Sequence, residues 1–205
     1  MSDAVLTETE ATGAAPAHTT STGISNEKLA MWVFLGSDCL LFGALISTYL
    51  LLRHRSTTPP FDPAEVFDIP FTSVSSFVLL MSSLTMALAV GAIHRGDVRR
   101  CRTWLLTTAL LGATFISGQV YEFSGFKNEG LGYTTNIFGS AFYTLTGFHG
   151  VHVSVGILFL MSLFVMSLRG KLDASKAETV EIFGLYWHFV DIVWILIFTI
   201  VYLIP

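Results

Sequence analysis

Six ionisable residues of this chain lie inside long apolar stretches. They are Asp38, Glu122, His149, His152, His188 and Asp191. An aspartate at the centre of a membrane-spanning helix costs about 2.5–3.5 kcal/mol on insertion scales, so such a side chain needs a partner or a polar cavity. Carboxylates and imidazoles in these places can ligate a metal ion, or they can hold and transfer a proton. Both kinds of chemistry have to be weighed.

A metal site is the first alternative. His149 and His152, and likewise His188 and Asp191, are spaced by three and share one face of a helix. Counted from the expected cytoplasmic ends at ~1.5 Å per residue, His188 lies roughly 14 Å and His149 roughly 28 Å from that surface. One metal ion or one haem does not bridge this gap. We therefore expect separate hydrogen-bonded side chains and predict no metal site.

Proton chemistry is the second alternative, and it centres on the two carboxylic acids. Asp38 lies at roughly the same height as His188, about 14 Å from the inner surface, so a pair between them is a hypothesis. Burial disfavours the charged form, and we expect Asp38 to be either a protonated, proton-related acid or a hydrogen-bonding anchor between helices. Glu122 lies near the outer end of its segment, where it is either a second such acid or an interfacial anchor.

The composition places these residues in a membrane protein. Hydrophobic residues make up 52% of the chain and charged residues only 13%, whereas soluble domains carry about 25% charge. Residues 1–28 are rich in Ala, Thr, Ser and Glu, and they are predicted to form a disordered cytoplasmic tail. We predict an all-α bundle of five transmembrane helices over residues 29–205, each with about the 20 residues that a span requires. The helices are expected at 29–52, 71–93, 103–123, 137–168 and 179–204.

Basic residues predict the orientation. The loops at 94–102 and 169–178, together with Lys28, hold eight lysines and arginines, and the opposite side holds three. By the positive-inside rule, the N-terminus is expected inside and the C-terminus outside. No basic face is dense enough to bind nucleic acid. Cys39 and Cys101 form no disulfide framework or zinc motif, and both are expected to be free thiols.

Close helix packing is predicted from small residues. The stretch GSAFYTLTGFHGVHVSVG, from Gly139 to Gly156, contains four glycines, and Gly147 and Gly150 flank its first histidine. Small residues let the backbones of membrane helices approach each other. Spacing by four repeats in two further segments, at Ser83, Ala87 and Gly91, and at Ala109, Ala113 and Ser117. These patterns indicate a bundle, but they indicate no activity.

Four segments resemble subunit III of haem–copper respiratory oxidases (cytochrome c oxidase), in its short five-helix form. The resemblance covers about residues 29–205 and rests on FLGSDCLLFGALISTY, on HRGDVRR with QVYEF, on FGSAFYTLTGFHGVHVSVG and on EIFGLYWHFVDIVWILIFTIVY. The combination of TGFHGVHV and YWHFVD is highly specific. Two departures are that Asp38 stands where the family usually has glutamate, and that the two additional N-terminal helices of longer members are missing.

The resemblance implies an accessory subunit of a proton-pumping terminal oxidase of aerobic respiration, in a prokaryotic cell membrane. It implies no redox centre of its own, since haem and copper reside in the catalytic subunit I and in subunit II beside it. It also implies support of sustained proton uptake and turnover, bound phospholipid, and another small subunit in place of the missing helices. Arg169 is a candidate for a lipid headgroup, or an ordinary positive-inside anchor. The polar residues of the last two helices are expected to serve packing or hydrogen bonding: His149, His152, Glu181, His188 and Asp191.

Other functions stay open at this point. Subunit III of a quinol oxidase, or an accessory protein of nitric oxide reductase, fits the same residues, because electrons enter through other subunits. A self-sufficient carrier or haem protein is a third class. Among the aromatic residues, Tyr186, Trp187, Trp194 and Tyr202 are expected to pack rather than to contact a cofactor.

Overall fold

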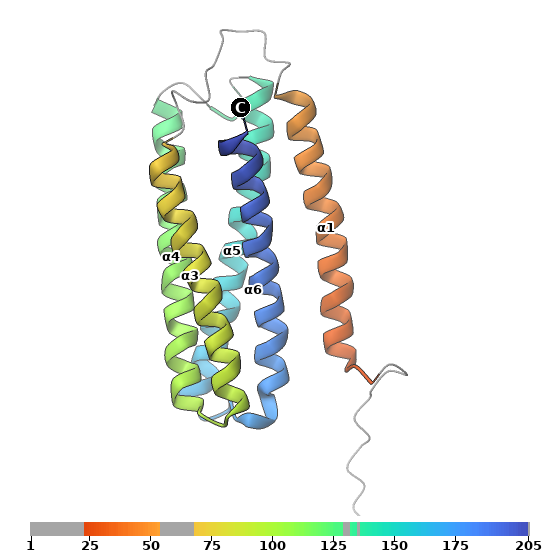
Figure 1. Ribbon diagram of the computed structural model, residues 1–205, viewed down its shortest axis with the longest axis vertical. Helices are drawn as coiled ribbons and strands as arrows, with labels where there is room; N and C mark the ends of the chain where they lie inside the picture. The colour runs from red at the N-terminus through yellow and green to blue at the C-terminus, as the bar shows by residue number, and fades with distance from the viewer. Residues whose placement is uncertain (1–22, 54–67, 129–131, 135, 205) are drawn as a thin grey trace, which may run out of the picture.

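The computed structural model describes residues 23–53, 68–128, 132–134 and 136–204. Five long helices make up most of this part (Figure 1): α1 (Asn26–Leu52), α3 (Ile69–His94), α4 (Val98–Asn128), α5 (Ile137–Leu168) and α6 (Ala177–Phe198). The short helix η1 (Ala174–Lys176) precedes α6, and a π-helical turn, η2 (Thr199–Leu203), follows it. The predicted all-α fold of five helices is confirmed. Residues 1–22 of the expected tail and 54–67 of the proline-rich loop lie outside the described residues.

Three helices begin at capping side chains. Ser25, Asp68 and Asn136 each accept a hydrogen bond from a backbone N–H three residues later, at 3.3, 3.1 and 2.6 Å. These bonds satisfy N–H groups that have no partner within the helix, which a helix end in or near a membrane particularly needs. In α3 a proline also occupies the first turn, where its missing N–H is harmless.

The turn between α3 and α4 is shorter than the loop predicted at 94–102. Only residues 95–97 separate the two helices. Gly96 adopts φ +74°, a left-handed conformation that suits glycine, and the Asp97 carboxylate accepts a hydrogen bond from Arg100 N at 3.0 Å. The arginines after this turn are therefore helical. Cys101 is a buried free thiol and Cys39 an exposed one, as expected.

The connection between α5 and α6 also turns at a glycine, Gly170, with φ +67°. Asp173 follows and opens η1, where its carboxylate accepts hydrogen bonds from the hydroxyl and the backbone N–H of Ser175. The Ser175 hydroxyl, more than any other neighbour, holds the pKa of the Asp173 carboxyl below its ordinary value.

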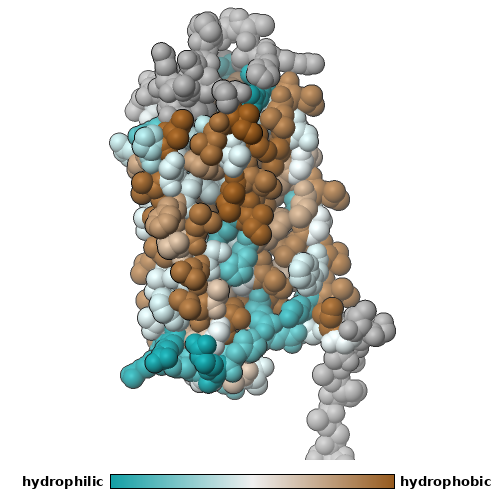
Figure 2. Space-filling view, in the orientation of Figure 1, coloured by the Kyte–Doolittle hydropathy of each residue, from teal (hydrophilic) through white to brown (hydrophobic). Residues whose placement is uncertain are grey.

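Helices α3, α4, α5 and α6 pack around one core, and α1 lies outside them against α5 and α6 (Figure 1). We call the end where α1, α4 and α6 begin the lower end. The basic loops predicted on one side both lie here, because consecutive helices run in opposite directions. Figure 2 shows a hydrophilic lower end below a largely apolar belt. The four helix segments 26–52, 69–94, 137–168 and 174–203 are long and apolar enough to cross a membrane. The fifth helix, α4, is as long but more polar, and it packs between α3 and α5.

The tightest helix contacts surround Trp187 of α6. A Cβ atom added to Gly112 of α4 would lie 2.6 Å from the indole Cη2, and one added to Gly156 of α5 would lie 2.8 Å from Cε3 and Cζ3. The indole Nε1 donates a hydrogen bond to Ser82 Oγ of α3 at 2.9 Å. One side chain therefore contacts three helices, and only glycine leaves room for it on two of them.

Most of the small residues that the sequence analysis named do not lie at these tight contacts around Trp187. Among the described residues, nothing from another helix lies within 4 Å of the would-be Cβ of Gly147, so the close approach predicted there is not found in this part of the chain. The would-be Cβ of Gly150, in contrast, lies 3.1 Å from Gln119 Oε1. Ala87, Ala113 and Ser117 are exposed. The spacing by four is present, but three of the six residues in these two stripes face outward.

Candidate functional site

Asp38 of α1 and His152 of α5 form a buried acid–base pair. The Asp38 residue is 6% exposed, and its Oδ2 lies 3.4 Å from His152 Nε2. The other ring nitrogen, Nδ1, is 2.7 Å from the carbonyl oxygen of Phe148. Because a carbonyl only accepts, Nδ1 must carry the hydrogen and donate it. The ring therefore turns Nε2 toward the Asp38 carboxyl, although Asp38 Oδ2 makes no hydrogen bond of normal geometry within the described residues.

The predicted pair between Asp38 and His188 is wrong. His188 Nδ1 is instead hydrogen-bonded to Ser83 Oγ of α3 at 2.6 Å. The prediction compared only heights along the helices, but the direction around the α6 axis decides which neighbour a side chain meets. His188 lies on the face of α6 that turns toward α3, while α1 approaches α5 near Phe42, whose ring centroid is 5.0 Å from that of His152.

His149 is fully buried among aromatic rings. Its ring stacks on Trp194 with centroids 4.9 Å apart and meets the edge of Phe115 at 6.0 Å. Neither ring nitrogen has a hydrogen-bond partner among the described residues. His149 thus ties α5 to α4 and α6 by ring packing, and the hydrogen bond expected of it is absent from this part of the chain.

Helix α6 supplies most of the hydrogen bonds between helices. The indole Nε1 of Trp194 donates to Ser76 Oγ at 2.8 Å, about two helical turns above the matching bond of Trp187. The Tyr186 hydroxyl donates to the backbone carbonyl of His152 at 2.9 Å. These aromatic residues pack as expected, and their polar atoms join α6 to both α3 and α5.

Glu122 is buried near the upper end of the bundle, at 7% exposure. Its carboxylate accepts a hydrogen bond from the Thr72 hydroxyl at 2.6 Å, and it also interacts with the Tyr202 hydroxyl. A water-exposed interfacial anchor does not fit this burial. Glu122 is an internal acid that joins α3, α4 and η2.

At the lower end, Glu181 of α6 joins three helices. Its two carboxylate oxygens pair with Lys28 Nζ at 2.7 Å and with His94 Nε2 at 2.5 Å. Ser25 adds a short hydrogen bond to Glu178. The contact ties the start of α1 to the end of α3. Arg169 lies at the same end, directly after α5, and it is exposed.

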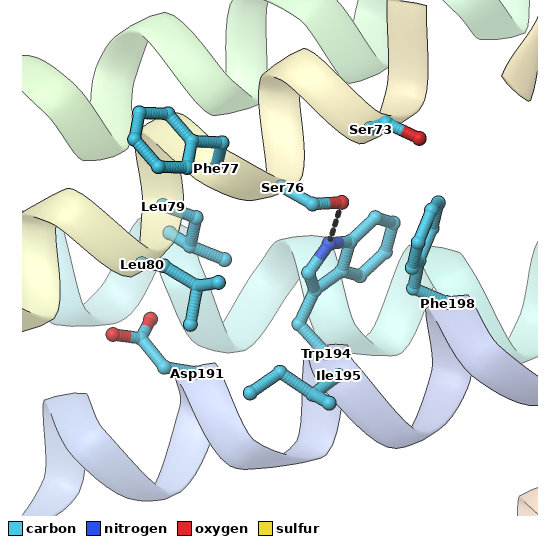
Figure 3. A pocket seen from close by; sticks show the side chains of 9 residues that line it. All are labelled: Ser73, Ser76, Phe77, Leu79, Leu80, Asp191, Trp194, Ile195 and Phe198. Atoms are coloured by element: carbon cyan, nitrogen blue, oxygen red, sulfur yellow. Dashed lines mark hydrogen bonds between the residues drawn. The ribbon is translucent and has the colours of Figure 1, made fainter. Parts of the chain in front are cut away.

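Asp191 differs from the other acids. It is 3% exposed, and neither carboxylate oxygen accepts a hydrogen bond from the described residues. It lines an apolar cavity of about 320 Å³ between α3 and α6, together with Ser76, Leu80 and Trp194 (Figure 3). The sequence marked Asp191 as polar, but only the structure separates it from the acids that have partners.

These features define a class: an integral membrane bundle whose buried acids mostly pair with groups on other helices. In the described residues, no three His, Cys, Asp or Glu side chains gather as a metal site requires. A model of the family "Cytochrome c oxidase subunit III" matches residues 4–204. The chain belongs to this family, whose members are subunits of haem–copper oxidase complexes, with catalytic subunits as partners.

Relatives support the same assignment over nearly the whole chain. Cytochrome c oxidase subunit 3 of Bacillus sp. strain PS3 is 38% identical over 93% of this chain and 91% of its own. Cytochrome bo(3) ubiquinol oxidase subunit 3 of Pseudomonas aeruginosa is 38% identical over 87% of this chain and 85% of its own. A probable quinol oxidase subunit 3 of Staphylococcus saprophyticus is 37% identical over 86% and 88%. The relatives are bacterial, which suggests a cell membrane for this multi-pass protein.

Proposed function

We propose that this chain sustains turnover of the catalytic subunit of a proton-pumping terminal oxidase, by supporting proton uptake, and that it carries no redox centre itself. The observation that carries this proposal is the Asp38–His152 pair. Its atoms lie 3.4 Å apart between α1 and α5, with the ring orientation set by the Phe148 carbonyl. Such a pair places a carboxyl and an imidazole, two side chains that can bind and release a proton, next to each other inside the bundle.

The proposed orientation has the lower end in the cytoplasm. Lys28 and the arginines and lysines after α3 and α5 all lie at that end, and positive charge favours the cytoplasmic side. The N-terminus is then inside and the C-terminus outside. In this orientation Glu181, His94 and Lys28 form an ionisable group at the surface from which an oxidase takes up protons.

Lipid binding is the second part of the proposal. A cavity of about 390 Å³ lies where α1, α5 and α6 meet, and Met31, Phe34, Phe159 and Tyr186 are among its lining residues. Its walls are almost entirely apolar, which suits a phospholipid acyl chain. Arg169, exposed at the lower end of α5, is the proposed contact for a headgroup phosphate, which a planar guanidinium binds with two parallel hydrogen bonds.

Both kinds of oxidase named by the relatives fit this role. Cytochrome c oxidase and quinol oxidase subunits are 37–38% identical to the chain. Similarity therefore favours neither electron donor. The proposed role is the same with either donor, because it concerns proton uptake and lipid and not the entry of electrons.

The test uses the purified oxidase with and without this chain. We expect the depleted complex to keep its haem and copper content and its initial rate, but to lose oxygen consumption faster during continuous turnover. Adding back the wild-type chain should restore the lifetime, and a chain with Asp38→Leu should restore it only in part. Gly147→Ala, at a position with open space around it, is the matched control. Undiminished, sustained activity of the depleted complex would refute the proposal.

A further inference from the structure

The Asp191 carboxyl is a buried acceptor without a hydrogen-bond donor among the described residues. Asp38 Oδ2 also lacks a hydrogen bond, but it has the His152 ring 3.4 Å away. Glu122 accepts from Thr72, and Glu181 pairs with Lys28 and His94. Both oxygens of Asp191, in contrast, lack a hydrogen-bond partner among the described residues although the residue is 3% exposed. The Ser83 hydroxyl lies near this carboxyl and interacts with it, but its only hydrogen bond of normal geometry in the described residues is the 2.6 Å one with His188. A buried acid in this state calls for a donor from outside the chain.

The depth of Asp191 limits what that donor can be. Counted from Ala177 at ~1.5 Å per residue, Asp191 lies about 21 Å along α6, within an apolar core that is about 30 Å thick. Lipid headgroups lie at the surfaces and do not reach this depth. Acyl chains reach it, but they have no hydrogen to donate. A protein side chain within the membrane satisfies both conditions.

The surface beside Asp191 has the shape that a helix needs. We use the term α3–α6 seam for the surface where these helices meet, from Ser73 to Ala87 on α3 and from Leu185 to Phe198 on α6. Two cavities lie along it, one of about 320 Å³ at Asp191 and one of about 280 Å³ that includes Ala87 and His188. The seam extends for about 21 Å along the helix axes. Figure 2 shows hydrophilic surface reaching from the lower end into the apolar belt between these two helices.

Small side chains on the seam would let another backbone approach closely. Ser73, Ser76 and Ala87 line the two cavities. Residues of this size are typical of contacts between membrane helices, where no hydrophobic effect drives association and close approach supplies the attraction. Among the described residues, only the start of α1 reaches the seam, where Lys28 lines the lower cavity. The rest of α1 packs on the other side of α6, against α5 (Figure 1).

We propose that the α3–α6 seam receives a transmembrane helix of the oxidase's catalytic subunit, and that a side-chain donor of this helix hydrogen-bonds to Asp191. This inference rests on the proposed function, since it requires an oxidase partner, but it assigns the contact to one face of the bundle. The apolar cavity on the α1 side has no unpaired carboxylate and is left to lipid.

The first experiment compares two variants in the assembled oxidase and in the isolated full chain. Asp191→Leu removes the acceptor, and Asp191→Asn keeps one. In the complex, we expect Asp191→Leu to bind the other subunits about threefold to twentyfold more weakly, as for hydrogen bonds between membrane helices, and Asp191→Asn to lose less. In the isolated chain, both variants should unfold at the same temperature as wild type or higher, because there the acid has no partner to lose. A lower unfolding temperature in the isolated chain, with unchanged association, would make Asp191 an internal structural residue and overturn the inference.

The second experiment locates the partner directly. A photo-crosslinking amino acid replaces Phe77 on the seam or Leu110 on α4, two positions that are equally exposed at 59%. In the assembled oxidase, we expect Phe77 to crosslink to the catalytic subunit at least several-fold more than Leu110. Crosslinks from Phe77 to lipid or quinone alone, or equal yields at both positions, would refute the inference while leaving the proposed function standing. If the chain does not copurify with an oxidase at all, the proposed function itself fails.

Discussion

Replacing Gly156 with alanine should loosen the bundle, although the change adds only one methyl group. The new Cβ would lie 2.8 Å from two carbon atoms of the Trp187 ring, about 0.7 Å inside the shortest normal carbon–carbon contact. The indole has no free direction to move, since Gly112 limits it on α4 and the 2.9 Å bond to Ser82 holds its Nε1. Overpacking of this kind costs about 1–3 kcal/mol, partly offset by the roughly 0.8 kcal/mol that alanine gains over glycine in a helix.

Gly147→Ala is the matched control on the same helix. No atom of another residue lies within 4 Å of its would-be Cβ, so this variant should be neutral or slightly stabilised. Thermal unfolding of the full chain in detergent measures both variants, and each kcal/mol corresponds to about 2–4 °C for a chain of this size. We expect Gly156→Ala to unfold several degrees below Gly147→Ala.

A double variant tests whether the clash with the Trp187 ring causes the loss of stability. Trp187→Phe removes the ring atoms Cε3 and Cζ3 that the new methyl group would meet. In the Trp187→Phe background, Gly156→Ala should therefore cost less than it does in the wild type. Equal unfolding temperatures for the two single alanine variants, or strictly additive effects in the double variant, would refute the reasoning.

Two further predictions concern polar pairs. His152→Leu should destabilise the chain by about 1–3 kcal/mol because it leaves Asp38 buried without a partner, and adding Asp38→Leu should recover part of this loss in the same thermal assay. Additive losses in that double variant would show that the two residues do not act as a pair. Glu181→Gln should lower stability by no more than about 1 kcal/mol, since the contact with Lys28 and His94 is partly exposed. Its effect should shrink at high salt, and an effect independent of salt would argue against an ionic contribution.

The fold was largely predictable from hydropathy, but the ends of helices were less so. The apolar segment 137–168 coincides with α5. Helix α4 was predicted to begin at 103, and it begins at Val98 instead. Hydropathy falls at the arginines of this turn, yet arginine is a good helix former and Asp97 caps the backbone. Hydropathy thus marks where a helix lies in the membrane, and capping marks where it begins.

The partners of the polar residues were not predictable in the same way. The sequence marks His149 and His152 as two similar polar residues on one helix, yet one packs among aromatic rings and the other faces Asp38. Their partners depend on how α5 is rotated against its neighbours, which is decided by packing along the whole helix. The same holds for glycine: Gly156 matters because Trp187 faces it, and nothing in its own surroundings in the sequence distinguishes it from Gly147.

Hydrogen-bond satisfaction also separates lipid-facing surfaces from protein-facing surfaces in such a bundle, where exposed apolar area does not. Every outer face of this bundle is rich in leucine, valine and phenylalanine. Such a face can contact either lipid or a helix of another subunit, so its apolar area does not distinguish the two. On the α1 side, Asp38 Oδ2 has the His152 ring 3.4 Å away, although without a hydrogen bond of normal geometry, and the apolar cavity there has no carboxylate in its lining. On the α3–α6 seam, Asp191 has no hydrogen-bond donor among the described residues, and hydrocarbon cannot supply one. By this criterion, we expect the α3–α6 seam to be the face that another subunit covers.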